Sequence, residues 1–176
     1  MEQHKILLVG NTHRGKTKFL KYNILEELYD KPCSTLGVEV YPLDFKFANL
    51  NMTFNVWDTA GDERYKGLDD GYYINSKGAI LFYSTNKEKN LYIKKLKAVD
   101  PNMKIVLVYT HTSDKIYKKD NNIKMSDKYK NCIINMNYAE FMDLPFILMA
   151  SELYPQKKEE ILNNINVKRY NEIYNN

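Results

Sequence analysis

Apolar runs and amphipathic stretches alternate along the chain. Six short apolar runs have the composition of β-strands. They are KILLVG (5–10), VEVYPLDFKFA (38–48), MTFNVWD (52–58), GAILFYS (78–84), KIVLVYT (104–110) and NCIINMN (131–137). The second and third runs are joined by the polar turn Asn49-Leu50-Asn51, so a hairpin is predicted there.

The stretches between these runs predict helices. Residues 17–29, 86–99 and 141–154 are predicted helices, and the first carries apolar residues at helical spacing: Phe19, Leu20, Ile24, Leu25 and Leu28. Pro155 separates the last of them from a tail with apolar residues near one side of a further helix: Ile161, Leu162, Ile165, Tyr170, Ile173 and Tyr174. Strands that alternate with helices, several of them apolar throughout, predict an α/β fold with a mostly parallel six-stranded sheet flanked by helices. In such folds the ligand lies at the carboxyl ends of the strands.

Composition places the chain among folded single-domain proteins. Of its 176 residues, 44% are apolar and 27% are charged, and no apolar run approaches the roughly 20 residues of a membrane span. The net charge of +4 comes mostly from scattered lysines, so a solvated surface is expected and nucleic-acid binding is not. Two cysteines do not make a disulfide framework, and the three histidines (His4, His13 and His111) have no zinc-ligand spacing.

The segment GNTHRGKT, residues 10–17, meets the pattern G-x-x-x-x-G-K-[ST] between a predicted strand and a predicted helix. There, backbone N–H groups point at phosphates, a lysine reaches the outer phosphates, and a hydroxyl binds Mg²⁺. The competing interpretation is a glycine turn with an exposed lysine. The predicted phosphate-binding residues are Gly10, Asn11, Thr12, His13, Arg14, Gly15, Lys16, Thr17 and Lys18.

Two further segments complete a predicted metal and phosphate site. Asp58 ends an apolar strand and would enter the Mg²⁺ shell, while the N–H of Gly61 would face the terminal phosphate. Thr35 would close over the same metal. The predicted metal ligands are therefore Thr17, Thr35 and Asp58.

These three segments, in this order and at this spacing, resemble the small GTPases of the Ras superfamily. The strings TLGVEVYPLDF and WDTAGDERYKGLDDGYY are most similar to the Ran family of nuclear-transport GTPases. The resemblance implies a P-loop NTPase fold of the small G-protein type, GTP or GDP as ligand, and Mg²⁺ as cofactor. It also implies two switch segments, residues 32–40 and 60–73, that order around the terminal phosphate.

By the same resemblance, residues 1–155 form a Ran-like G domain and residues 156–176 a C-terminal amphipathic helix or tail. Nuclear-transport receptors or Ran regulators are the implied partners of the switch segments. The sequence has neither the acidic tail expected of Ran nor a C-terminal cysteine for lipid attachment, and it starts without a signal peptide. A monomer in the cytoplasm, the nucleus or both, with no membrane anchor, is expected.

Departures from the family pattern fall on the hydrolysis apparatus. Thr12 and His13 replace glycines, and a side chain at position 12 crowds both the transition state and an incoming arginine finger. Asp62 occupies the position of the glutamine that orients the attacking water, and its charge repels the phosphate. Slow or impaired hydrolysis is therefore predicted, with Lys16, Thr35 and Asp62 as the catalytic candidates; the alternative is that Asp62 acts as a base.

The base-reading segments also depart from the pattern. The family motif Asn-Lys-x-Asp corresponds to THTSD at residues 110–114, which puts the carboxylate one residue late. A one-residue bulge could still present this carboxylate, and Tyr29 could replace the ring that stacks on guanine. The predicted base-site residues are Tyr29, Thr110, His111, Asp114, Met136 and Asn137. Guanine is the favoured base, and relaxed base specificity is the alternative.

Three hypotheses follow from these residues. The first is a Ran-like, Mg²⁺-dependent nucleotide switch with slow hydrolysis. The second is an active GTPase that cycles with exchange and activating proteins, which Thr12 and Asp62 disfavour. The third is a pseudo-GTPase interaction module, which five intact residues disfavour: Lys16, Thr17, Thr35, Asp58 and Gly61.

Overall fold

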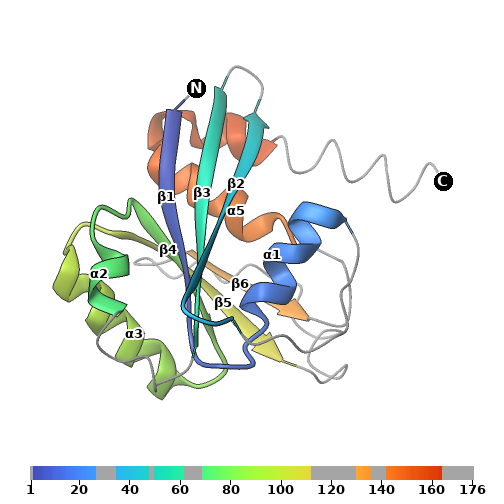
Figure 1. Ribbon diagram of the computed structural model, residues 1–176. Coiled ribbons are helices and arrows are strands. Elements are labelled where there is room, and N and C mark those ends of the chain that lie inside the picture. Colours follow the sequence, from blue (N-terminus) through green and yellow to red (C-terminus); the bar gives the residue numbers. More distant parts are fainter. Residues whose placement is uncertain are drawn as a thin grey trace.

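The computed structural model describes residues 2–26, 35–47, 50–61, 69–111, 130–135 and 142–163. Within these ranges a six-stranded sheet has the order β2-β3-β1-β4-β5-β6 (Figure 1). Every neighbouring pair is parallel except β2 and β3, which are antiparallel. The predicted mostly parallel sheet, flanked by helices, is confirmed.

All six predicted strands are present. They are β1 (Glu2–Val9), β2 (Val38–Phe47), β3 (Leu50–Thr59), β4 (Gly78–Tyr83), β5 (Lys104–His111) and β6 (Lys130–Asn135). The predicted hairpin is confirmed, but its turn lies one residue earlier than expected. Phe47 pairs directly with Leu50, so only residues 48 and 49 connect the two strands. Leu50 is 8% exposed, and burial of this side chain keeps it in the strand.

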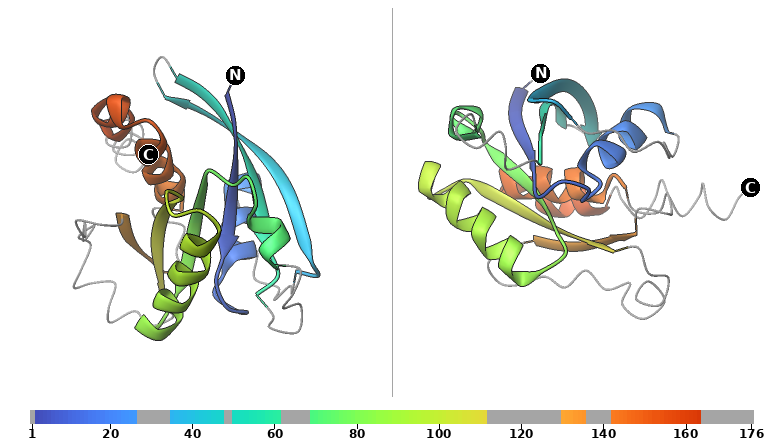
Figure 2. Two further views of the ribbon diagram at one scale, coloured as in Figure 1. Left: turned by 90° about the vertical axis from the view of Figure 1, so that its left-hand side faces the viewer. Right: turned by 60° about the horizontal axis from the view of Figure 1, so that its bottom comes forward.

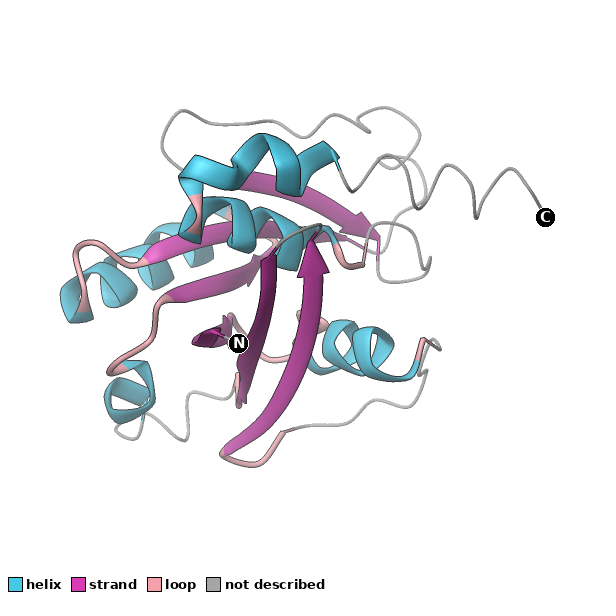
Figure 3. Ribbon diagram, turned by 90° about the horizontal axis from the view of Figure 1, so that it is seen from above, coloured by secondary structure: helices cyan, strands magenta, loops and turns pink. Residues whose placement is uncertain are grey.

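In the described ranges the labelled helices are α1 (Lys16–Leu25), α2 (Asp69–Tyr73), α3 (Asn86–Val99) and α5 (Leu144–Leu153), followed by the 3-10 turn η2 (Pro155–Lys157). Figure 3 shows them on both sides of the twisted sheet. The prediction for residues 86–99 is confirmed to the residue. The prediction that the first helix extends to residue 29 is wrong, because Glu26 adopts a left-handed φ of 58° and its N–H closes the last turn on the Tyr22 carbonyl. Five residues are too few to give a periodic pattern, so α2 was not predicted.

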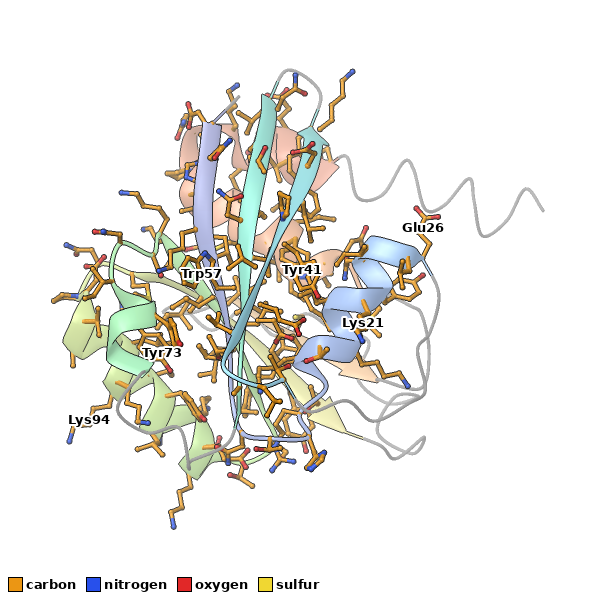
Figure 4. The ribbon with its side chains drawn as sticks, viewed as in Figure 1. Lys21, Glu26, Tyr41, Trp57, Tyr73 and Lys94 are labelled. Atoms are coloured by element: carbon orange, nitrogen blue, oxygen red, sulfur yellow. The ribbon has the colours of Figure 1, made fainter. Side chains whose placement is uncertain are left out.

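Two apolar clusters cover the two faces of the sheet. Helices α1 and α5 pack with β1 and β3 on one face, and α2 and α3 pack with β4 and β5 on the other (Figure 2). Side chains of the hairpin alternate between the faces, so Tyr41 packs on the α1 side and Trp57 on the α2 side (Figure 4). This arrangement places α1 and α3 on opposite sides of the strand that leads into the glycine-rich loop.

A capping box begins α3. The Thr85 side chain accepts a hydrogen bond from the Glu88 N–H, and the Glu88 carboxylate accepts one from the Thr85 N–H. This reciprocal pair satisfies two donors that have no partner within the helix. The start of α3 is thereby fixed at Asn86.

After η2 the chain continues in a helical turn at residues 158–163. Ile161 is 1% exposed and belongs to the same apolar cluster as α5. Leu162 is partly buried and packs against the same cluster. The other apolar positions of the predicted tail helix (Ile165, Tyr170, Ile173 and Tyr174) lie outside the described residues, and the boundary at residue 155 stays a prediction. In the described ranges, no helix is both long enough and apolar enough to cross a membrane.

Candidate functional site

The loop between β1 and α1 has a backbone that depends on glycine at both ends. A β-carbon on Gly10 would lie 2.2 Å from the carbonyl oxygen of Phe82, and Gly15 has a φ of 81° directly before α1. Between them His13 adopts a φ of 60°, which a residue with a β-carbon adopts at a cost. The loop lies at the carboxyl end of β1, at the bottom of Figure 1, where the sequence predicts the ligand.

Lys16 lies in the first turn of α1 and points back under this loop. The residue is 6% exposed, and its ammonium donates to the carbonyl oxygens of Gly10 at 2.9 Å and Asn11 at 3.1 Å. Burial lowers the pKa of Lys16 to about 8, against the opposing attraction of the Asp58 carboxylate. The alternative of a glycine turn with an exposed lysine is therefore wrong.

The three predicted metal ligands come together from three different segments. The hydroxyl of Thr17 donates to Asp58 Oδ2 at 2.6 Å, and the hydroxyl of Thr35 donates to the same oxygen at 3.1 Å. The two hydroxyl oxygens are 2.8 Å apart. The other carboxylate oxygen, Oδ1 of Asp58, is buried without a hydrogen-bond partner among the described residues.

This set of oxygens fits Mg²⁺, which prefers hard oxygen ligands. An unpaired buried carboxylate oxygen is costly, and a cation would satisfy it. Burial raises the pKa of Asp58, while the hydroxyl of Thr17 and the charge of Lys16 hold it down. Thr17, Thr35 and Asp58 would hold the ion, and the ion would supply positive charge beside the phosphates.

The described ends of both predicted switch segments meet at this loop. The Ala60 N–H donates to the Gly37 carbonyl at 2.8 Å, and the Thr12 N–H donates to the Gly61 carbonyl at 3.0 Å. A β-carbon on Gly61 would lie 2.4 Å from the Thr12 nitrogen and 2.6 Å from Lys16 Nζ. Only glycine therefore fits at position 61; the predicted contact of its N–H with a terminal phosphate stays a prediction.

Two residues of the site were not found from the sequence. Glu88 accepts hydrogen bonds from the side chains of Asn11 at 2.9 Å and Arg14 at 2.6 Å, and the Tyr92 hydroxyl donates to the Asn11 side chain at 3.1 Å. The pattern Thr85-x-x-Glu88 indicates a helix start. Nothing in the sequence links that helix start to the phosphate loop.

A sequence model of the family described as Roc, "Ras of Complex, Roc, domain of DAPkinase", matches residues 5–113. This is more than half of the chain, and it runs from β1 past the end of β5. The chain belongs to the Roc family. Roc is a GTPase domain of the Ras superfamily, which confirms the resemblance at that level and the small G-protein fold. The chain is therefore a GTP-binding protein of the Ras superfamily.

The match covers most of the predicted site of this Roc domain. Thr110 is buried at the end of β5, and its hydroxyl donates to the Tyr83 carbonyl at 3.5 Å. The backbone of His111 pairs with Asn135 of β6, but its side chain is outside the described set. Four base-site predictions and one catalytic prediction also lie outside the described residues: Tyr29, Asp114, Met136, Asn137 and Asp62.

Proposed function

We propose that this Roc domain is a Mg²⁺-dependent guanine-nucleotide switch with slow GTP hydrolysis. The observation that carries the proposal is the convergence of Thr17, Thr35 and Asp58 beside the buried ammonium of Lys16. In this fold such groups hold the metal and the outer phosphates. Thr35 belongs to the first predicted switch segment, so the metal would tie that segment to the bound nucleotide.

Slow hydrolysis is expected because two residues, Thr12 and Asp62, disfavour the transition state of hydrolysis without weakening the binding of the nucleotide. Thr12 places a branched side chain on the loop, beside Gly61, where the family has glycine. Asp62 follows Gly61 directly and brings a negative charge where the family has an amide. Neither change removes the ammonium, the hydroxyls or the loop N–H groups that bind the ground state.

The finer relationship we propose is with Ran. Its support is the similarity of TLGVEVYPLDF and WDTAGDERYKGLDDGYY to the switch segments of that family. The partners we propose are nuclear-transport receptors or Ran regulators that bind these segments, on a monomer found in the cytoplasm, the nucleus or both. An active GTPase that cycles with such regulators is the second candidate, and its support is that Lys16, Thr17 and Thr35 lie together beside the loop, where they would assist catalysis.

Hydrolysis rates separate these two candidates. We expect single-turnover hydrolysis no faster than a Ras-type intrinsic rate of about 10⁻⁴ s⁻¹. Restoring both positions, Thr12→Gly with Asp62→Gln, should raise this rate at least about tenfold, which corresponds to about 1.4 kcal/mol of the barrier. The measurement is phosphate release from preloaded GTP, with Thr12→Val as a control that keeps the β-branched side chain. Fast hydrolysis by the wild type with a Ran-type activating protein would favour the active GTPase, and no gain in the double variant would contradict the roles of Thr12 and Asp62.

Base discrimination is expected to be weaker than in relatives with an intact Asn-Lys-x-Asp motif. Ser113 stands where the carboxylate that accepts two bonds from guanine is expected, and a hydroxyl is a poor acceptor for that pair. Competition of GTP and ATP against one fluorescent analogue should give a preference for guanine of less than about 10⁴-fold. A larger preference would show that Asp114 or another group restores the readout. Asp114→Asn is the matched variant, because it should abolish any preference that Asp114 supplies.

A further inference from the structure

One carboxylate, that of Glu88, ties the phosphate loop to the start of α3. Both lie at the same end of the molecule, at the bottom of Figure 1. We propose that Glu88 is a positioning residue for phosphate binding: it fixes Asn11 and Arg14, which flank Thr12 and His13, and so aims the loop N–H groups before a nucleotide arrives. The inference rests on the proposed function, because it concerns nucleotide binding at this loop.

The tie consists of direct side-chain contacts. Glu88 Oε1 accepts from Asn11 Nδ2 at 2.9 Å and from Arg14 Nη2 at 2.6 Å, and Oε2 accepts from Arg14 Nε at 3.3 Å. The carbonyl end of the Asn11 side chain accepts from the Tyr92 hydroxyl at 3.1 Å, one turn further along α3. We call Asn11, Arg14, Glu88 and Tyr92 the α3 clamp.

The same carboxylate caps the helix. Its Oε2 also accepts from the N–H groups of Ser84 at 2.9 Å and Thr85 at 3.3 Å. Hydrogen bonds from Arg14 lower the pKa of Glu88 to about 2, so the group is ionised at neutral pH. Only a carboxylate can accept hydrogen bonds from the loop side chains with one oxygen and from the N–H groups at the helix start with the other. An amide could keep the cap with its oxygen, but it would then turn its own N–H groups toward the donors of Asn11 and Arg14.

The loop has a physical need for such a tie. His13 lies in the left-handed region with a φ of 60°, and this conformation has a cost that surrounding contacts must offset. Fixing the loop beforehand also removes part of the ordering cost from the binding step. The clamp holds the residues before and after the Thr12-His13 pair, and the Gly61 carbonyl holds Thr12 from the other side.

A different role for Arg14 leads to the opposite expectation. If its guanidinium bound phosphate directly, Glu88 would compete for it, and removing the carboxylate would strengthen binding. In the structure both Nε and Nη2 of Arg14 are directed at Glu88, and the pair is largely shielded, with side-chain exposures of 28% for Arg14 and 14% for Glu88. The geometry favours the positioning role.

The test compares GDP and GMP affinities of Glu88→Gln, Arg14→Ala, their double variant, and Thr85→Ala, by competition with fluorescent GDP in Mg²⁺. Glu88→Gln and Arg14→Ala should each weaken GDP binding about tenfold, the range of one lost charge-assisted contact. The loop N–H groups would bind the β-phosphate, which GDP has and GMP lacks. The ratio of GDP to GMP affinity should therefore fall as well. The double variant should lose no more than about twofold beyond the larger single loss. Thr85→Ala removes the other half of the capping box, so its urea midpoint should fall while its affinity stays unchanged.

Four results of the affinity measurements would overturn the proposal. Three of them are unchanged GDP affinity in Glu88→Gln, tighter binding in Glu88→Gln with weaker binding in Arg14→Ala, and fully additive losses in the double variant. Equal loss of GDP and GMP affinity would indicate a general structural effect and would also overturn it.

Hydrogen exchange in the nucleotide-free protein separates this proposal from the proposed function. Glu88→Gln should speed exchange in the loop peptide and leave the start of α3 unchanged, whereas Thr85→Ala should do the reverse. If the wild type binds no nucleotide but the loop exchange follows this pattern, the clamp stands and nucleotide binding is rejected. If the loop exchange does not change in Glu88→Gln, the clamp is rejected whatever the nucleotide result.

Discussion

Lys16→Ala should weaken the binding of GTP and GDP by at least about 100-fold. In the described part of the chain, the Lys16 ammonium is the one positive group buried beneath the phosphate loop. Its two hydrogen bonds to loop carbonyls show how close it lies to the loop backbone. Two charge-assisted hydrogen bonds of about 1.5–3 kcal/mol each exceed the roughly 2.7 kcal/mol that 100-fold requires. Calorimetric titration of the nucleotide-free protein measures the effect. Lys94→Ala is the matched control, because Lys94 is exposed on α3 and points away from the site (Figure 4).

The same lysine should make binding depend on pH. With a pKa of about 8 in the free protein, Lys16 loses its proton as the pH rises through that value. A bound phosphate favours the charged form and raises this pKa, so binding takes up a proton near and above pH 8. Affinity should therefore fall between pH 7.5 and pH 9 — to a first approximation by up to about tenfold per pH unit. Lys16→Ala should show no such slope, and equal slopes in both proteins would contradict the role of Lys16.

Asp58→Asn should remove the magnesium dependence of nucleotide binding. Asp58 Oδ1 is buried without a partner in the described residues, and Oδ2 receives both threonine hydroxyls. Asparagine keeps the shape and an acceptor oxygen but not the charge that holds the ion. Loss of a residue that only supports a metal ligand typically costs about 10–100-fold in metal affinity, so loss of the ligand itself should exceed about 100-fold.

The measurement is the rate of release of fluorescent GDP in Mg²⁺ and in EDTA. In the wild type, chelation should speed release strongly; in Asp58→Asn, release should be fast in both conditions. Asp44→Asn is the control, because Asp44 is exposed on β2 and its carboxylate accepts a hydrogen bond from the Thr53 hydroxyl on the neighbouring strand. A wild type whose release does not respond to EDTA would contradict the assignment of this metal site.

Local patterns predicted most of the fold because several strands are apolar throughout and α3 has an unbroken helical period. They failed where a single residue decides the geometry. The end of α1 depends on the left-handed φ of Glu26, and the hairpin turn depends on the burial of Leu50. No residue preference specifies either outcome in advance: the exposed Glu26 closes α1 through a local hydrogen bond to Tyr22, and the burial of Leu50 results from tertiary packing.

For the site, sequence spacing was enough to predict that Lys16, Thr17 and Asp58 lie close together. The glycine-rich loop and the end of the strand with Asp58 are at the same edge of a parallel sheet, so their relative position is fixed. The α3 clamp could not be found this way. Glu88 follows the loop by more than 70 positions, and as a capping residue it already has a local explanation. Its second role depends on which side of the sheet α3 packs, and this follows only from the assembled fold.

The most direct measurement of the central claim is the nucleotide that the purified protein carries. The wild type and Lys16→Ala would be purified in Mg²⁺ and denatured, and any released nucleotide would be identified and quantified by chromatography. The wild type should release guanine nucleotide in nearly equimolar amount, and Lys16→Ala should release almost none. A wild type that releases no nucleotide, or equal amounts from both proteins, would contradict the assignment of this loop as a guanine-nucleotide site.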